Sequence, residues 1–213
     1  MTMTEETPAV SVTVPAEVLL EMAKAASAVA EKAKTWPKLS CAWLTFVPAK
    51  EVLAIAATDV HVAVKASTGG AGSEFGEKVE HVAVLAKALE AAVKNVAAGA
   101  LDVEVSIAER HVLLAGRNWA GERIGLARVD REIGLERPQL EGVLAAGRAI
   151  EGGDGIDRWS VEQGELAKLA KLGGRTTWAL RVMGMSPRLV GSWTSDSGVY
   201  YEAAVALRPE GTA

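Results

Sequence analysis

The residue types that perform catalysis or bind metals are few and scattered in this sequence. The histidines are His61, His81 and His111, and the single cysteine is Cys41. Asp59 and His61 form an Asp-x-His pair, which supplies too few ligands for a zinc site. The stretches "GGAG" (69–72) and "EGGDG" (151–155) lack the strand-to-helix setting of a phosphate-binding loop. We therefore expect no catalytic residue, no metal site and no cofactor, and we predict that the chain is not an enzyme.

Asp59 is the only charged residue in the apolar stretch "LAIAATDVHVAV" (53–64). Thr and Asp side chains bond to nearby backbone groups and thereby fix tight corners. We interpret Thr58 and Asp59 as the corner between two strands. This structural role explains the pair without assigning chemistry to it.

Composition narrows the classes of protein further. The 213 residues are 49% hydrophobic, which predicts a sizeable core. The net charge of −4 argues against an overall basic surface for nucleic acid, although it leaves room for a local one. A single cysteine excludes an intrachain disulfide and fits a reducing compartment. No apolar run approaches the roughly 20 residues of a membrane span, and the acidic N-terminus differs from a signal peptide. We expect a cytoplasmic protein with no membrane partner.

The predicted elements follow an order typical of α+β proteins. Over the first 130 residues we expect a strand, a helix, three strands, a short strand, a second helix and three more strands. The predicted helices cover 16–34 and 84–98, and their apolar stripes predict which residues are buried. The stripes are Leu19, Met22, Ala26 and Val29 in the first helix, and Leu85, Leu89, Ala92 and Val96 in the second. The predicted strands are 10–14, 39–47, 51–58, 60–66, 78–82, 101–107, 111–116 and 122–129.

The C-terminal third repeats half of this pattern. A helix predicted over 160–174 precedes three strands, at an offset near 77 residues from the second helix and its strands. The intervening segment contains a short predicted helix over 137–150, and it lacks an obvious three-strand block. We predict two domains, 9–130 and 131–208, of which the second is reduced.

This order of elements resembles that of the DNA polymerase processivity factors, the sliding clamps, and most closely the bacterial β-clamp type. The resemblance rests on "AEKAKTWPKLSCAWLTF" (30–46), "LAIAATD" (53–59) and "VHVAV" (60–64), which match a clamp's helix, Leu-Ser segment and strands in order. The ending "VYYEAAVALRP" (199–209) also resembles a clamp's final strand. The resemblance implies an α+β DNA-clamp fold, with helices packed on antiparallel sheets and two clamp-like repeats.

The resemblance also implies a function. Sliding clamps encircle duplex DNA and tether a replicative polymerase, and a clamp loader places them on DNA. Their helices line the channel, where outward Lys and Arg meet phosphates without reading sequence. The corresponding DNA-binding candidates are Lys24, Lys87, Lys94, Arg148, Lys168, Lys171 and Arg175. The simpler alternative is that such lysines are only solvated.

Two further expectations follow from the resemblance. The last domain of a β clamp carries an apolar pocket for polymerase peptides, so the peptide-binding candidates are Trp178, Trp193, Tyr200 and Tyr201; the alternative is that these rings are core residues. Because clamp rings contain six domains, a two-domain chain would close as a homotrimer. A reduced clamp of this kind also suggests a phage or mobile element as its source. The alternative function is a clamp-derived adaptor or inhibitor that forms no ring and binds replication or repair proteins.

Overall fold

The computed structural model describes residues 10–30, 36–47, 51–59, 61–69, 80–138, 140, 144, 148–149, 159–161, 163–172, 177–183 and 186–209. The N-terminal part contains β1 (Val10–Pro15), α1 (Ala16–Val29), the 3-10 helix η1 (Pro37–Leu39), β2 (Cys41–Val47), β3 (Val52–Thr58), β4 (Val62–Ser67), β5 (Glu80–Leu85), α2 (Ala86–Ala97), β6 (Asp102–Ile107), β7 (His111–Arg117) and β8 (Arg123–Asp130). The predicted α+β class, with helices packed on antiparallel sheets, is confirmed.

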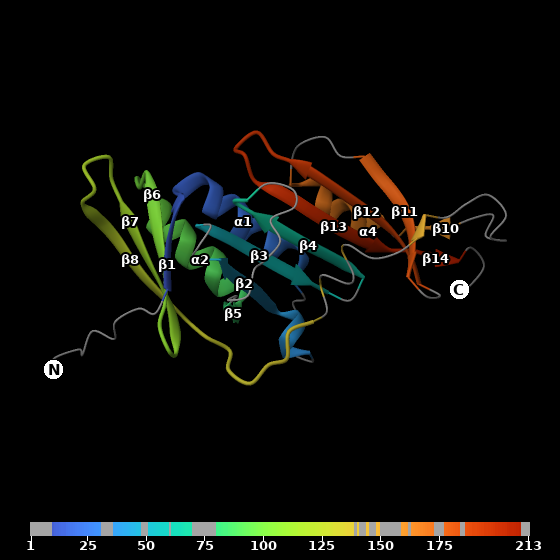
Figure 1. Cartoon of the computed structure of the whole chain (residues 1–213), viewed down its shortest axis with the longest axis horizontal. Coiled ribbons are helices and arrows are strands. Elements are labelled where there is room, and N and C mark those ends of the chain that lie inside the picture. Colours follow the sequence, from blue (N-terminus) through green and yellow to red (C-terminus); the bar gives the residue numbers. More distant parts are fainter. Residues whose placement is uncertain are drawn as a thin grey trace.

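The C-terminal part is shorter and continues one sheet of the N-terminal part. It contains β9 (Arg148–Ala149), β10 (Trp159–Ser160), α4 (Gln163–Ala170), β11 (Thr177–Met183), β12 (Ser186–Thr194), β13 (Tyr200–Ala206) and β14 (Arg208–Pro209). One sheet has the order β1-β6-β7-β8, and the other runs β5-β2-β3-β4-β13-β12-β11-β9. Strand β10 pairs with β14 in a separate two-stranded sheet. The pairing of β4 with β13 therefore joins the two parts of the chain into one long sheet (Figure 1).

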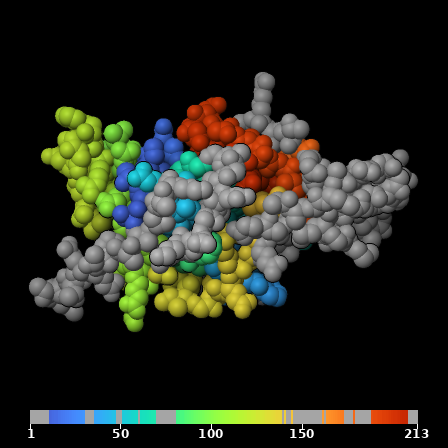
Figure 2. Space-filling view, viewed as in Figure 1, coloured from blue at the N-terminus to red at the C-terminus, as the bar shows by residue number. Residues whose placement is uncertain are grey.

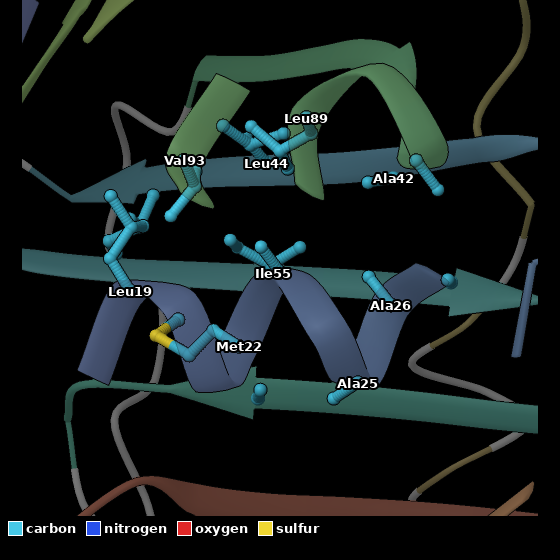
Figure 3. Packing of buried hydrophobic residues seen from close by; sticks show 14 of the residues in the cluster. Leu19, Met22, Ala25, Ala26, Ala42, Leu44, Ile55, Leu89 and Val93 are labelled. Atoms are coloured by element: carbon cyan, nitrogen blue, oxygen red, sulfur yellow. The ribbon is translucent and has the colours of Figure 1, made fainter. Parts of the chain in front are cut away.

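Helix α1 forms where the sequence combines a start signal with good helix-forming residues. Pro15 precedes its first turn, and the Ala-rich segment that follows favours helix. All four predicted stripe residues are buried. Figure 3 shows Leu19 and Met22 of α1 beside Ile55 of β3, with Leu89 and Val93 of α2 near Leu44 of β2. The two helices thus share one apolar core with the strands.

The buried stripe of α2 differs from the predicted one. Leu89 and Val96 are buried as expected, but the other buried positions are Ala86 and Val93. Leu85 is 44% exposed because it ends β5 instead of opening the helix. Helix α2 also lies very close to β7: a Cβ built on Gly116 would be 2.5 Å from the carbonyl oxygen of Val96. This close approach requires a glycine.

The segment after β8 covers the outer face of the long sheet. Leu140 and Leu144 are helical and pack in a second apolar cluster with Trp43 of β2 and Ala204 of β13. The space-filling view shows part of this segment along one side of the molecule (Figure 2). The predicted helix over 137–150 is wrong at its C-terminal end, because Arg148 lies in β9 and pairs with Val182 of β11.

Candidate nucleic-acid interface and the junction of the two repeats

The Thr58-Asp59 corner is held by bonds from both side chains. Asp59 Oδ1 accepts the backbone N–H groups of His61 (3.1 Å) and Val62 (2.8 Å). The Thr58 hydroxyl donates to the Val62 carbonyl oxygen at 2.9 Å, and the Asp59 N–H donates to the same oxygen at 3.1 Å. These bonds satisfy the backbone between β3 and β4. The interpretation of the pair as a structural corner agrees with this geometry.

The same corner connects the two repeats. Asp59 Oδ2 forms an ion pair with Lys168 Nζ on α4, and the Asp59 side chain is only 9% exposed. His61 Nδ1 lies 3.8 Å from a carboxylate oxygen of the buried Glu165, also on α4. The corner thus fixes α4 against the N-terminal part as well as turning the chain.

A second set of polar contacts joins the repeats beside the β4–β13 pair. Lys65 Nζ of β4 donates to Glu202 Oε2 of β13 at 2.8 Å. Glu21 of α1 accepts the Tyr201 hydroxyl at 2.9 Å and also accepts the Ser197 hydroxyl. Burial, together with the Glu21 carboxylate, raises the pKa of Tyr201. These contacts hold α1 and β4 in fixed positions relative to β13.

Helix surfaces carry most of the predicted DNA-binding residues that the structure describes. Lys24 on α1, Lys87 and Lys94 on α2, and Lys171 just after α4 are exposed. Lys87 makes a loose ion pair with Glu90 at 3.5 Å, and its side chain is 67% exposed. Such an exposed pair is worth little in water, so it leaves Lys87 available to a phosphate.

The other three predicted DNA-binding residues are not exposed lysines on a helix surface or are not described. Lys168 was expected to face solvent, but its ion pair with Asp59 leaves its side chain 34% exposed. Its partner lies 109 residues earlier in the sequence, so helical spacing alone could not reveal the pair. Arg148 lies in β9 instead of a helix. Arg175 lies outside the described residues.

The predicted peptide-binding aromatics lie mainly in the core. Trp193 is 6% exposed and Tyr201 is fully buried, and their rings stack with centroids 5.0 Å apart. Trp178 is partly buried, with its ring centroid 6.2 Å from that of Trp193. Tyr200 is partly exposed and precedes Tyr201 in the same strand, so it points to the opposite face. Two of the four candidates are therefore core residues, as the alternative interpretation held.

The sequence interpretation did not identify several large apolar side chains that are exposed in β8 and next to it. Leu101, Trp119, Ile124 and Leu126 are 59%, 88%, 46% and 62% exposed, respectively. Trp119 lies in the turn between β7 and β8, and Leu126 lies in β8. The sequence pattern predicted a loop and a strand here, but not which side chains are exposed. Whether a strand has a neighbour on both sides depends on the whole sheet and cannot be read from its own sequence.

The described residues were also compared with the requirements of metal binding, thiol reactivity and membrane spanning. No group of three or more His, Cys, Asp or Glu that could hold a metal ion occurs there. Burial, with a smaller effect from Glu132, raises the pKa of Cys41 to about 11, so its thiol stays protonated at neutral pH. None of the helices described is long and apolar enough to cross a membrane.

Known structures share this architecture. No family model matches the chain, and no curated protein sequence does so either. The Helicobacter pylori β clamp bound to a DNA ligase peptide is similar with a TM-score of 0.68 and 13% identity, covering 98% of this chain and 68% of the clamp. The same clamp in complex with diflunisal gives a TM-score of 0.70 and 12% identity, with the same coverage.

The similarity extends to clamps of other bacteria. The DNA polymerase III β subunit of Thermotoga maritima gives a TM-score of 0.57 and 14% identity over 92% of this chain. This chain spans only 64% of that subunit, which is less than two thirds of its length. The similar structures are consistently β subunits or sliding clamps. The chain therefore has the DNA-clamp fold seen in bacterial β clamps.

Proposed function

We propose that the protein is a non-enzymatic scaffold of the sliding-clamp type, which contacts duplex DNA and tethers a replication protein to it. The observation that carries this proposal is the exposed face of α2, where Lys87 and Lys94 lie seven residues apart on a clamp-fold domain. Positions seven apart in a helix share one face, so both ammonium groups can reach phosphates of one duplex. Lys24 and Lys171 extend the proposed contact to α1 and to the end of α4.

The proposed contact is electrostatic and independent of base sequence. Lysine ammonium groups on a helix surface can bind phosphates without entering a groove, so they distinguish no base pairs. Each phosphate that is neutralised releases counterions, and affinity therefore falls as salt rises. An acidic chain with a local basic face would bind weakly, which suits a protein that moves along DNA.

A charge-matched pair of variants tests this proposal. Lys87→Glu/Lys94→Glu changes the net charge by −4, and Lys38→Glu/Arg110→Glu makes the same change at exposed positions outside the helices α1, α2 and α4. We expect the α2 variant to bind a 30-base-pair duplex at least tenfold more weakly at low salt, with a shallower salt dependence. The control variant should stay within about threefold of the parent. Equal losses in both variants would show that only total charge matters.

The second candidate is a clamp-derived adaptor or inhibitor that forms no ring of its own copies. It is favoured by the pairing of β4, which contacts β3 on one edge and β13 on the other. A homotrimer that joined its subunits as β4 joins β13 would need an unpaired β4 in each chain. Light scattering separates the candidates, because a ring of identical chains gives a mass of three chains and the adaptor gives one. The first proposal also includes a polymerase and a clamp loader as partners and a phage or mobile element as the source, as expected from the sequence.

A further inference from the structure

Lys168 lies beside the proposed DNA contact. Helices α2, α1 and α4 follow one another along the long axis of the molecule, and α1 packs against both of the others (Figure 1). Each of the three carries an exposed lysine or is directly followed by one. Lys168 lies on α4 three residues before the exposed Lys171, so the two side chains occupy neighbouring positions on the helix surface. A phosphate bound at Lys171 is therefore close to Lys168 as well.

The ammonium group of Lys168 is held by Asp59, a residue of the β3–β4 corner. Asp59 Oδ2 accepts the ammonium group, whereas Asp59 Oδ1 accepts the backbone N–H groups of His61 and Val62. The Asp59 side chain is 9% exposed and is fixed by these backbone bonds, while the Lys168 side chain is 34% exposed. The acid is thus the fixed partner of the pair, and the lysine is the partner that can turn towards solvent.

The Asp59 carboxylate and a DNA phosphate are alternative acceptors for the same ammonium group. A lysine has three N–H donors on a flexible stem, so it can exchange one anionic acceptor for another. While the pair is closed, the charge of Lys168 is neutralised within the protein and adds little to the attraction of a duplex. When the pair opens, the same charge becomes available to a phosphate beside Lys171.

The ion pair is weak enough for this exchange to occur. A pair that is partly open to water favours its closed form by no more than a factor of about five. A new phosphate contact raises DNA affinity by a similar or larger factor at low salt, because each neutralised phosphate releases counterions. The two acceptors therefore compete on nearly equal terms, and rising salt favours the internal one.

We propose that Asp59 limits the affinity of the protein for DNA by acting as an internal counterion for Lys168, which contacts a phosphate only when Asp59 releases it. The inference rests on the proposed DNA contact and adds to it a residue that does not itself touch DNA. The effect is reciprocal, because DNA that binds Lys168 removes one link between α4 and the β3–β4 corner. Bound DNA thus loosens the junction of the two repeats, and a closed junction weakens the binding of DNA.

Asp59→Asn separates the counterion role of Asp59 from its role in the corner. The amide oxygen keeps both backbone N–H bonds, and the NH2 group that replaces Oδ2 cannot accept a bond from the ammonium group. We expect this variant to bind the duplex about fivefold more tightly than the parent at about 50 mM salt, with a salt slope steeper by about 0.9, as for one additional phosphate contact. Fluorescence anisotropy measures the affinity, and circular dichroism verifies that the variant is folded.

Two further variants test whether Lys168 is responsible for the gain. Lys168→Ala alone should weaken binding by less than about twofold, because Asp59 already neutralises this lysine in the parent. Asp59→Asn/Lys168→Ala should bind within about twofold of the parent, without the gain. A gain that persisted in the double variant would overturn the inference, since it would come from the charge of Asp59 alone. A loss in Lys168→Ala as large as the gain in Asp59→Asn would also overturn it, because Lys168 would then contact DNA with Asp59 in place.

Asp130→Asn is the matched control. Asp130 Oδ1 pairs with Arg128 at 3.2 Å on β8, so this change alters the net charge equally and also releases a cation, but outside the helices. It should leave the DNA affinity within about twofold of that of the parent. An equal gain in this variant would show that only total charge matters and would overturn the inference.

Lysine acetylation identifies the contact itself. Duplex DNA should protect Lys168 from acetylation in Asp59→Asn, and to a smaller extent in the parent. Tighter binding by Asp59→Asn without protection of Lys168 would overturn the inference.

The inference and the proposed DNA contact fail in different ways. If neither the parent nor Asp59→Asn binds DNA, the proposed contact is wrong and the inference is wrong with it. If the parent binds DNA through Lys87 and Lys94 but Asp59→Asn brings no gain, only the inference is overturned.

Discussion

Replacement of Asp59 by alanine should destabilise the junction of the two repeats. The change removes the acceptor of the Val62 N–H at 2.8 Å and of the more exposed His61 N–H at 3.1 Å. It also removes the ion pair with Lys168. Net contributions of about 1.5 kcal/mol for the shorter charged bond, and about 1 kcal/mol together for the exposed bond and half-exposed pair, give a loss of about 2 to 3 kcal/mol.

Asp59→Asn separates the two contributions. The amide oxygen still accepts both backbone N–H groups, so only the ion pair is lost and the cost should be about 1 kcal/mol. Lys168→Ala should cost a similar amount, and the double variant Asp59→Asn/Lys168→Ala should cost little more than either single one. The resulting coupling energy should be close to 1 kcal/mol. The assay is urea unfolding followed by tryptophan fluorescence and circular dichroism.

Two results would refute this reasoning. If Asp59→Asn were as damaging as Asp59→Ala, the backbone bonds would not dominate the corner. If the single costs of Asp59→Asn and Lys168→Ala simply added, the two side chains would not interact in solution. A variant such as Lys38→Ala, at an exposed position on η1, provides the baseline for a lysine that makes no such pair and should change stability by less than about 0.5 kcal/mol.

Other predictions follow from glycine and thiol environments. Gly116→Ala should lower the free energy of unfolding by about 3 kcal/mol, because its Cβ would meet the Val96 carbonyl oxygen. Gly164→Ala on α4 has nothing within 4 Å and should instead stabilise by about 0.5 to 1 kcal/mol; urea titrations of both variants check the contrast. The pKa of Cys41 is about 11 in the folded protein, above its ordinary value of 9.0. The contribution of this thiol to the free energy of unfolding is therefore fully present below pH 9 and should fall by about 2 to 3 kcal/mol between pH 9 and 11. Unfolding titrations of Cys41→Ala should show a correspondingly flatter decline over this range.

The fold was largely predictable from local signals in the sequence. The Ala-rich, periodic segment after Pro15 predicted α1 and its buried face because 3.6-residue periodicity directly reports burial. The end of β3 at Thr58 was predicted from turn chemistry, whereas β4 begins at Val62, two residues after its predicted start. The predicted stripe of α2 was wrong at two positions: Leu85 ends β5 because the helix begins two residues later than predicted, and Val93 is buried where Ala92 was expected. The sequence determines the exact first and last residues of a helix less precisely than it determines that a helix forms.

The candidate site was less predictable because it depends on distant contacts. Lys168 has the local spacing of an exposed residue, and only the fold brings Asp59 beside it. Trp193 and Tyr201 fit a surface pocket equally well in sequence, yet their strands place both rings in the core.

Lysine footprinting tests most directly the central claim that the helix face meets DNA. The full-length protein is acetylated with and without excess duplex DNA at low salt, and the modified lysines are quantified by mass spectrometry. We predict that DNA protects Lys87 and Lys94 most strongly and that Lys24 and Lys171 are also protected, whereas Lys38 is modified equally in both samples. Protection of Lys38 to the same extent, or no protection of Lys87 and Lys94 under conditions where DNA is bound, would contradict the account.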